Sequence, residues 1–149
     1  MGVIDIARTN VVTATPETPV AEVIRRLHQH SVGGLVVVDG DRPLDMITDR
    51  DLTMALLEEN FDAEQEPIRD FIDGDTPVIA AETGIYETIE ILSERGVRRT
   101  ILVEDDELAG IISISDIVVL LGMELQLVAN TIRSSAPAYE REGPGYYAQ

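Results

Sequence analysis

Apolar residues follow a helical period in two separate parts of this chain. In segments 20–27 and 85–92 they recur at spacings of three and four residues, which places them on one face of an amphipathic helix. A short, wholly apolar run follows each segment, at residues 35–38 and 101–103. Such runs suit β-strands that are covered on both faces. The pattern therefore predicts two copies of a helix followed by a buried strand.

The two copies belong to one internal repeat. An offset of 65 residues, as from Asp51 to Asp116, aligns the two halves of the chain without a gap. Identical residues at this offset run the length of both halves: Asp5 and Asp70, Glu22 and Glu87, Leu27 and Leu92, Val38 and Val103, Ile47 and Ile112. Because chance seldom yields so long a register, we interpret the chain as a doubled structural unit.

Each half predicts the element order β-α-β-β-α. The first helix of each unit is announced by Thr18-Pro19 and by Thr83-Gly84, where a threonine is expected as N-cap and Pro19 as the first helical residue. The remaining predicted elements are strand starts at 11–14 and 77–80, turns at 39–43 and 104–107, second strands at 45–48 and 110–113, and closing helices from near Asp51 and Asp116. This order predicts an α/β (α+β) fold.

Three segments follow from this repeat. Residues 1–66 form the first unit with an acidic linker that begins at Glu58, and residues 67–133 form the second unit. Residues 134–149 contain Pro and Gly but little aliphatic content, so we expect a flexible C-terminal tail.

Composition removes many classes of function. Of 149 residues, 28 are acidic and 11 are basic, and the net charge is −17. Every basic residue is Arg, and Cys is absent, so P-loop lysines, Schiff-base lysines, thiolate nucleophiles and zinc–thiolate sites are excluded. The negative charge disfavours nucleic acid and anionic lipid as partners. This Lys-free, acidic composition resembles that of proteins from halophilic organisms, although a GC-rich genome is an alternative source.

Sequence features also limit where the protein resides. We find no segment with the roughly 18 apolar residues that span a bilayer, and no basic region precedes an apolar stretch at the N-terminus. We therefore expect a cytoplasmic protein without a membrane partner. No residue set has metal-ligand spacing and no nucleophile–base pair is found, so we expect neither a metal nor an enzymatic activity.

A family resemblance rests on two motifs at the same place in both units. Residues 47–52 read Ile-Thr-Asp-Arg-Asp-Leu and residues 111–117 read Ile-Ile-Ser-Ile-Ser-Asp-Ile. The doubled unit with these motifs resembles a pair of CBS domains with pseudo-two-fold symmetry, also called a Bateman module, over about residues 3–130. The resemblance implies a regulatory protein that binds an adenosine ligand (AMP, ADP, ATP or S-adenosylmethionine) between the repeats and needs no other cofactor.

The resemblance assigns ligand roles to the motif residues. In Thr48-x-x-Asp51 and Ser113-x-x-Asp116 the hydroxyl would contact phosphate or ribose, and the carboxylate would accept hydrogen bonds from the ribose diol. A structural alternative stays open, because the same spacing is that of a helix capping box. The two roles are compatible with each other.

Arginines supply the expected phosphate contacts. The resemblance places Arg98 and Arg99 toward the central cavity, where planar cationic donors suit phosphate oxygens, whereas the aligned residues of the first unit are Gly33 and Gly34. The alternative is pairing with surface carboxylates. We therefore expect two unequal clefts. The complete predicted site comprises Ala14, Thr15, Thr48, Arg50, Asp51, Ile79, Ala80, Arg98, Arg99, Ser113, Ser115 and Asp116. Ala14, Thr15, Ile79 and Ala80, with their neighbours Thr13 and Val78, would line the adenine through backbone contacts and apolar surface; the alternative is that these strand starts are only core.

Two further expectations concern the first cleft and the last helix. Asp45 stands where many members of the family have Gly, and its carboxylate would disfavour a phosphate there. The last predicted helix, about residues 116–132, is more apolar than a monomer would cover, so we expect a homodimer and an unidentified protein partner. The rival interpretation is a dimeric interaction scaffold whose clefts stay empty or degenerate.

Overall fold

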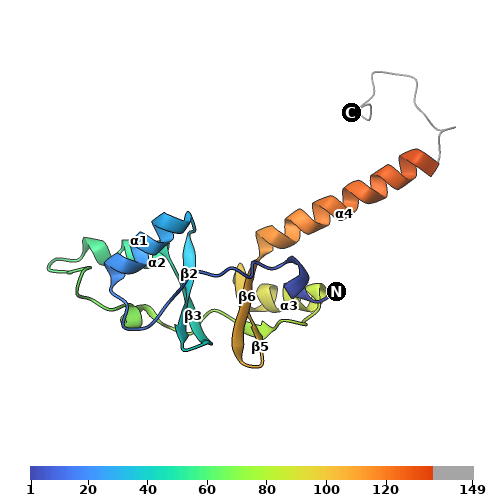
Figure 1. Ribbon diagram of the computed structural model, residues 1–149. Coiled ribbons are helices and arrows are strands. Elements are labelled where there is room, and N and C mark those ends of the chain that lie inside the picture. Colours follow the sequence, from blue (N-terminus) through green and yellow to red (C-terminus); the bar gives the residue numbers. More distant parts are fainter. Residues whose placement is uncertain (136–149) are drawn as a thin grey trace, which may run out of the picture.

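The computed structural model describes residues 1–135 and contains the predicted element order twice (Figure 1). Each repeat has a three-stranded sheet in which the first and second strands are parallel and the second and third are antiparallel. The elements of the first repeat are β1 (Thr13–Ala14), α1 (Val20–His30), β2 (Gly34–Asp39), β3 (Arg42–Thr48) and α2 (Asp49–Thr53). Those of the second are β4 (Val78–Ala80), α3 (Ile85–Arg95), β5 (Arg99–Glu104), β6 (Glu107–Ser113) and α4 (Ile114–Ser135).

In the β2–β3 and β5–β6 hairpins, the second strand (β3 or β6) begins earlier than predicted. Asp39 pairs with Arg42 and Glu104 pairs with Glu107, so only two residues form each turn. In the second hairpin both turn residues, Asp105 and Asp106, have left-handed φ values of 51° and 64°. Such two-residue turns match the twist of the strands they join, which lets pairing start at once.

The predicted threonine caps are wrong. α1 begins after Pro19 and no side chain caps it, while Thr18 Oγ1 accepts a hydrogen bond from the Thr15 N–H (3.1 Å). The linker satisfies the first helical donors instead, because Val20 and Ala21 donate to the carbonyls of Glu66 (2.9 Å) and Ala63 (2.8 Å). α3 likewise begins after Gly84 without a side-chain cap.

Each repeat is completed by the segment that leads into the other repeat. The short helix η1 (Val3–Ile6) precedes the first repeat, yet Val3 is fully buried in the core of the second. The short helix η3 (Ile68–Phe71) precedes the second repeat, yet Ile68 is fully buried in the core of the first. The N-terminus accordingly lies beside α3 in Figure 1. We call the segments before the two repeats, which contain η1 and η3, the leader segments. Each leader segment therefore crosses over and packs against the repeat that it does not precede.

A third apolar cluster joins the two sheets. Buried Val36, Val38 and Met46 of the first repeat pack with Ile101 of the second. The Leu108 N–H also donates to the Asp41 carbonyl across the boundary (2.8 Å). The repeats thus share a packed interface in addition to the crossed leaders.

The closing helices differ most between the repeats. α2 has five residues, whereas α4 has 22 and projects away from the body of the protein (Figure 1). α4 includes Ser134 and Ser135, which the sequence analysis places in the tail; the rest of that predicted tail lies outside the described residues. By length and composition α4 is apolar enough to cross a membrane, so the expectation that no segment reaches this threshold is wrong. That property alone is weak support for a membrane location.

Candidate functional site

The first motif lies at the junction of β3 and α2. Thr48 is the N-cap of α2, and its Oγ1 accepts a hydrogen bond from the Asp51 N–H (3.4 Å). In return, Asp51 Oδ2 accepts from the Thr48 N–H (2.8 Å) and from the Thr48 hydroxyl (3.0 Å). This reciprocal arrangement is a capping box, with Asp in place of the usual Glu. The structural alternative for the motif is therefore confirmed.

The second motif repeats the geometry at the junction of β6 and α4. Asp116 Oδ2 accepts from the Ser113 N–H and hydroxyl, each at 2.9 Å, and the Asp116 N–H donates to Ser113 Oγ (3.4 Å). One carboxylate oxygen of each motif is thus used by the cap. The ligand role that we predicted for these residues depends on the other oxygen.

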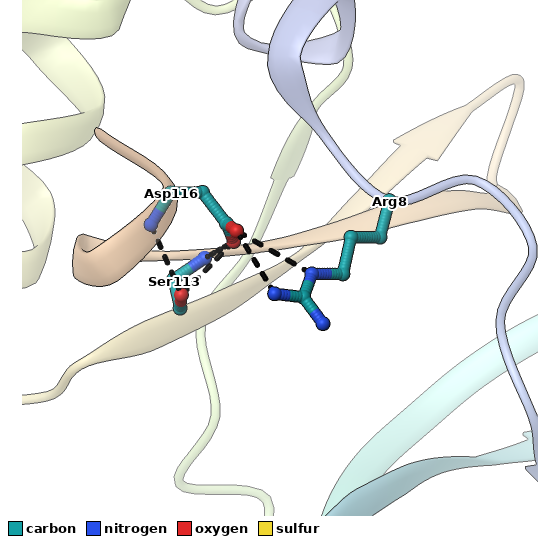
Figure 2. A network of polar contacts seen from close by, with 3 residues as sticks. All are labelled: Arg8, Ser113 and Asp116. Carbon is teal, nitrogen blue, oxygen red and sulfur yellow. Dashed lines mark hydrogen bonds and ion pairs between the residues drawn. The ribbon is translucent and has the colours of Figure 1, made fainter. Parts of the chain in front are cut away.

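The two motifs differ at the remaining carboxylate oxygen, Oδ1. Asp116 Oδ1 accepts hydrogen bonds from Arg8 Nη2 (3.2 Å) and Arg8 Nε (3.4 Å), as Figure 2 shows. Asp51 Oδ1 accepts no hydrogen bond from residues 1–135, and Asp51 is exposed. The first junction therefore presents an open acceptor, whereas the second junction has both oxygens engaged.

The environment of Asp116 stabilises its charged form. Partial burial raises the pKa of this carboxyl group, but the hydrogen bonds from Ser113 and the contact with Arg8 outweigh burial and hold the pKa below its usual value. The side chain of Asp116 is 17% exposed, and that of Arg8 is 67% exposed. Arg8 therefore neutralises a half-buried carboxylate from the solvent side.

Arg99 reaches from one junction toward the other. Its backbone pairs with Ser113 in the second sheet, just as Gly34 pairs with Thr48 in the first. A Cβ atom at Gly34 would lie 3.3 Å from Thr48 Cγ2 and 3.6 Å from Arg99 Nη1. The guanidinium of the second repeat thus lies beside the first motif. The nearest neighbour of a Cβ atom at Gly34 would be the Ile47 carbonyl oxygen at 3.2 Å, so the close approach here is to β3 rather than to Arg99.

The predicted arginines are not consumed by surface ion pairs. In the described part of the chain no salt bridge involves Arg50, Arg98 or Arg99, so the alternative of carboxylate pairing is not observed for them. Arg98 and Arg50 are exposed, and Arg99 is half-buried. Ser115 is also exposed, one residue before Asp116. All four side chains remain candidates for ligand contact.

Four of the residues predicted to line the adenine have unequal surroundings. Ala14 is 2% exposed and its side chain belongs to the core of the first repeat. Ile79 is half-buried against the core of the second repeat, and Ala80 is exposed. Thr15 is exposed, and its hydroxyl lies 3.2 Å from that of Thr18. Only backbone groups and partly exposed side chains at these positions can meet a ligand.

Asp45 is structural, which corrects the role that we expected for it. It is 1% exposed and accepts hydrogen bonds from the N–H groups of Met46 (2.8 Å), Asp73 (3.1 Å) and Gly74 (3.1 Å). Burial raises the pKa of Asp45, but hydrogen bonds from Thr76, Gly74 and Met46 outweigh burial and lower it. The carboxylate therefore fastens the segment after η3 to β3, and its oxygens are turned to protein donors.

A hollow of about 390 Å³ lies between the segment that leads into β1 and the end of α1. Val11, Val12, Thr13 and Val32 line it together with Asn10, Arg26 and His30. Val32 precedes Gly33, whose carbonyl accepts from the Asp49 N–H at the start of α2 (2.9 Å). The volume of this 390 Å³ hollow falls within the range of small-molecule pockets, about 300–1,000 Å³. A hollow of about 420 Å³ lies between α1 and α2 and is lined by Leu27, Leu52 and Leu56 together with Asp49, the first residue of α2.

Arg8 is the site residue that sequence reasoning missed. The repeat offset aligns it with Asp73, so the internal comparison gives no basic partner for it. Its position depends on the backbone pairing between Arg8 and Ile111, which only the folded chain reveals.

Comparison with known proteins identifies the architecture. A family model described as CBS domain matches residues 3–58 and again residues 68–122. The chain belongs to the CBS domain family. The two matches confirm the predicted pair of repeats, so we refer to the protein below as a CBS pair.

Its curated relatives include archaeal proteins of uncharacterised function. A protein of Methanopyrus kandleri is 27% identical over 140 residues, which cover 93% of this chain and 69% of the relative. A 17.7 kDa protein of Acidianus ambivalens is 28% identical over 142 residues, which cover 94% of this chain and 82% of the relative. The halophilic origin that we inferred from composition stays a prediction.

Solved structures share the fold. A CBS domain pair in complex with 5′-methylthioadenosine and S-adenosyl-L-methionine has a TM-score of 0.71 at 21% identity, covering 83% of this chain and 98% of that one. The protein CBSX2 in complex with AMP has a TM-score of 0.69 at 21% identity, covering 84% of this chain and 98% of that one.

Proposed function

We propose that this CBS pair is a regulatory module that binds an adenosine ligand at the junction of β3 and α2. The observation that carries the proposal is the open Oδ1 of Asp51 in a motif whose Thr48 lies close to Gly34 and to a cation from the other repeat, Arg99. Two solved CBS proteins of the same fold hold AMP or S-adenosylmethionine, which supports this class of ligand.

The surroundings of Asp51 supply the groups that such a ligand needs. A carboxylate oxygen accepts hydrogen bonds from a ribose diol, and the Arg99 guanidinium offers planar donors to phosphate oxygens. Arg98 and Arg50 are exposed cations that would extend the phosphate contacts. We place the base in the hollow that Val11, Val12 and Val32 line together with Arg26 and His30, which has both apolar and polar surface. The ligand would thus be held by a carboxylate, a cation and a hollow of mixed character.

This placement would couple binding to the arrangement of the repeats. Asp51 belongs to the first repeat and Arg99 to the second, so one ligand would contact both. A ligand shifts a conformational equilibrium only by its difference in affinity for the two states, and contacts to both repeats provide such a difference. An unidentified protein partner would then read the arrangement. The module itself would catalyse no reaction and would act in the cytoplasm.

α4 supports self-association. Its exposed residues Val118, Leu121, Leu125, Val128 and Ile132 are spaced by alternating steps of three and four, as in the apolar seam of a coiled coil. Gln126, Asn130 and Arg133 form a polar row beside this seam, where Gln126 donates to Asn130 (2.9 Å) and Arg133 also donates to Asn130 (3.1 Å). Val119, Met123 and Leu127 are exposed apolar residues elsewhere on the helix. A helix with this much exposed apolar surface suits a helical partner, and we propose a second copy of this chain along the regularly spaced seam.

The absence of cysteine makes the self-association directly testable. A single Leu125→Cys or Leu121→Cys substitution in the seam should give an oxidised dimer at low protein concentration. Gln126→Cys on the polar row is the matched control and should remain monomeric on a non-reducing gel. Equal cross-linking of seam and control variants would count against pairing through this seam.

The ligand is tested by thermal unfolding of the full chain at high potassium chloride. AMP, ADP, ATP, GTP, S-adenosylmethionine and NAD would each be added at about millimolar concentration. A ligand at a hundred times its dissociation constant adds about 2.7 kcal/mol to the free energy of unfolding, which gives a clear rise in midpoint. We expect a rise with at least one adenosine ligand, and a smaller rise in Arg99→Ala.

Arg42→Ala is the matched control, because Arg42 is an exposed arginine at the opposite end of β3 from Thr48. It should keep the full ligand response. A flat panel in the wild-type protein would contradict the proposal and favour the second candidate, a dimeric scaffold with empty clefts. The capping role of both motif carboxylates and the exposed seam of α4 are the observations that favour that candidate.

A further inference from the structure

We propose that Arg8 keeps the second junction closed, so that an adenosine ligand occupies the first junction in preference to the second. This inference rests on the proposed function and concerns the order in which its two junctions fill. It follows from the contacts of one side chain that lies far from Asp116 in the sequence.

Arg8 occupies the acceptor that a ribose would need. Asp116 Oδ2 already receives two hydrogen bonds from Ser113 (2.9 Å each), and Arg8 Nη2 and Nε approach Oδ1 at 3.2 and 3.4 Å (Figure 2). A ribose hydroxyl at Oδ1 must therefore displace a charged donor. At Asp51 the corresponding oxygen has no such donor in the part of the chain that the structure describes.

The backbone fixes Arg8 at this place. The Arg8 N–H donates to the Ile111 carbonyl and the Ile111 N–H donates to the Arg8 carbonyl, both at 2.9 Å. Gly110 permits this pairing, because a Cβ atom there would lie 2.8 Å from the Arg8 carbonyl oxygen. The Arg8 Cα is thus held against β6, two residues before Ser113 begins the cap. This strand pairing places the Arg8 guanidinium beside Asp116.

The first repeat has no equivalent of this contact. Asp73 is the residue that the offset aligns with Arg8, and an acidic side chain cannot donate to Asp51 in its charged form. The Asp73 N–H is instead used by Asp45 (3.1 Å). The sequence difference between Arg8 and Asp73 therefore makes the junctions unequal even though their capping boxes match.

The contact is weak enough to be displaced by ligand. The Arg8 side chain is 67% exposed, and exposed ion pairs contribute little because water and salt screen them. We expect Arg8 to lower the affinity of the second junction by roughly threefold to fivefold. The first junction would fill at low ligand concentration, and the second would fill later with release of Arg8.

The test isolates the second junction. Asp51→Asn removes the charged acceptor of the first junction, and in this background AMP and ATP are titrated calorimetrically with and without Arg8→Ala. We expect the added Arg8→Ala substitution to tighten binding at Asp116 by roughly threefold to fivefold. Arg69→Ala is the matched control, since Arg69 forms an exposed ion pair with Glu17 (2.6 Å), and it should leave the affinity unchanged.

Each other result overturns the inference in a recognisable way. Unchanged affinity would show that Arg8 does not compete with ligand, and weaker affinity would make Arg8 a phosphate contact. If the wild-type protein binds ligand but the Asp51→Asn, Arg8→Ala protein does not, then Asp116 takes no ligand. That result would overturn this inference and leave the proposed function intact. A wild-type protein that binds neither AMP nor ATP nor any other member of the ligand panel would overturn the proposed function and this inference together.

Discussion

The two strand-to-helix junctions of this CBS pair share a capping box but differ in what surrounds it. Thr48 with Asp51 and Ser113 with Asp116 form the same reciprocal hydrogen bonds. Arg8 then covers the second carboxylate, while Arg99 of the second repeat lies beside the first motif. The comparison teaches that helix starts are alike because backbone donors need partners, whereas the outer faces of the carboxylates are free to diverge.

The leader segments provide a second contrast at equivalent positions of β3 and β6. In the second repeat Gly110 lets the backbone of Arg8 approach closely, with no room for a Cβ atom. In the first repeat Asp45 reaches out to the N–H groups of Asp73 and Gly74. β6 therefore holds the leader segment that contains η1 by close backbone contact, whereas β3 holds the one that contains η3 by a buried carboxylate. Substitutions at these positions should test the comparison most severely.

The largest effect should come from Gly110→Ala. The new Cβ atom would lie 2.8 Å from the Arg8 carbonyl oxygen, so the leader must move and burial of Val3 is compromised. We expect a loss of about 2–3 kcal/mol in the free energy of unfolding, measured by urea denaturation. Gly33→Ala is the control, because nothing lies within 4 Å of a Cβ atom there. Equal stability of the two variants would contradict the close docking of the leader.

Asp45→Asn should have the next largest effect. An amide has one acceptor oxygen, so it cannot serve the Met46 N–H and the Asp73 and Gly74 N–H groups as both carboxylate oxygens do. We expect a loss of about 1–3 kcal/mol at neutral pH. A stability loss below about 0.3 kcal/mol would show that the carboxylate does not hold the leader.

The same carboxylate predicts a pH dependence. Because the folded state lowers the pKa of Asp45, its contribution is present above the unfolded pKa of about 3.9 and is lost as pH falls through the lower folded value. Urea denaturation at a series of pH values from 7 to below 4 should therefore show wild-type stability falling with acid. The fall should be shallower in Asp45→Asn, and parallel curves for the two proteins would contradict this assignment.

The capping boxes should contribute equally when no ligand is present. Thr48→Ala and Ser113→Ala each remove the hydroxyl that accepts from the motif Asp N–H. We expect each variant to lose about 1 kcal/mol in the free energy of unfolding. A stability loss confined to one repeat would show that the two caps are not equivalent.

Arg8→Ala should have the smallest effect on stability. The ion pair with Asp116 is largely exposed on the arginine side, so its removal should cost less than about 1 kcal/mol. The pKa of Asp116 should nevertheless rise toward its ordinary value, as followed by the NMR titration of its carboxyl carbon. Arg69→Ala should leave that pKa unchanged. An unaltered Asp116 pKa in Arg8→Ala would contradict the contact seen in Figure 2.

The sequence predicted the repeated architecture because its signals are local and occur twice. The apolar runs gave the buried strands Leu35–Val38 and Ile101–Val103 within β2 and β5, and the motif spacing gave both junctions. The early starts of β3 and β6 were missed because the turn conformations at residues 40–41 and 105–106 set them. The failed prediction of a Thr18 cap has a similar cause, since the linker supplies the partners of α1.

Contacts between distant segments could not be predicted from the repeat. An internal alignment relates Val3 to Ile68 but does not say which sheet each segment covers, and the structure shows that they cross. The contact of Arg8 with Asp116 depends on that crossing. Asp45 was misjudged for the same reason, because its N–H partners after η3 are far away in the sequence.

The central claim is that the first junction is the preferred ligand site, and paired calorimetric titrations of Asp51→Asn and Asp116→Asn test it most directly. Each asparagine retains a capping acceptor but lacks the charged oxygen pair. We expect Asp51→Asn to lose the high-affinity binding of the adenosine ligand that stabilises the wild-type protein, and Asp116→Asn to retain it. Loss of that binding in Asp116→Asn with retention in Asp51→Asn would contradict the account.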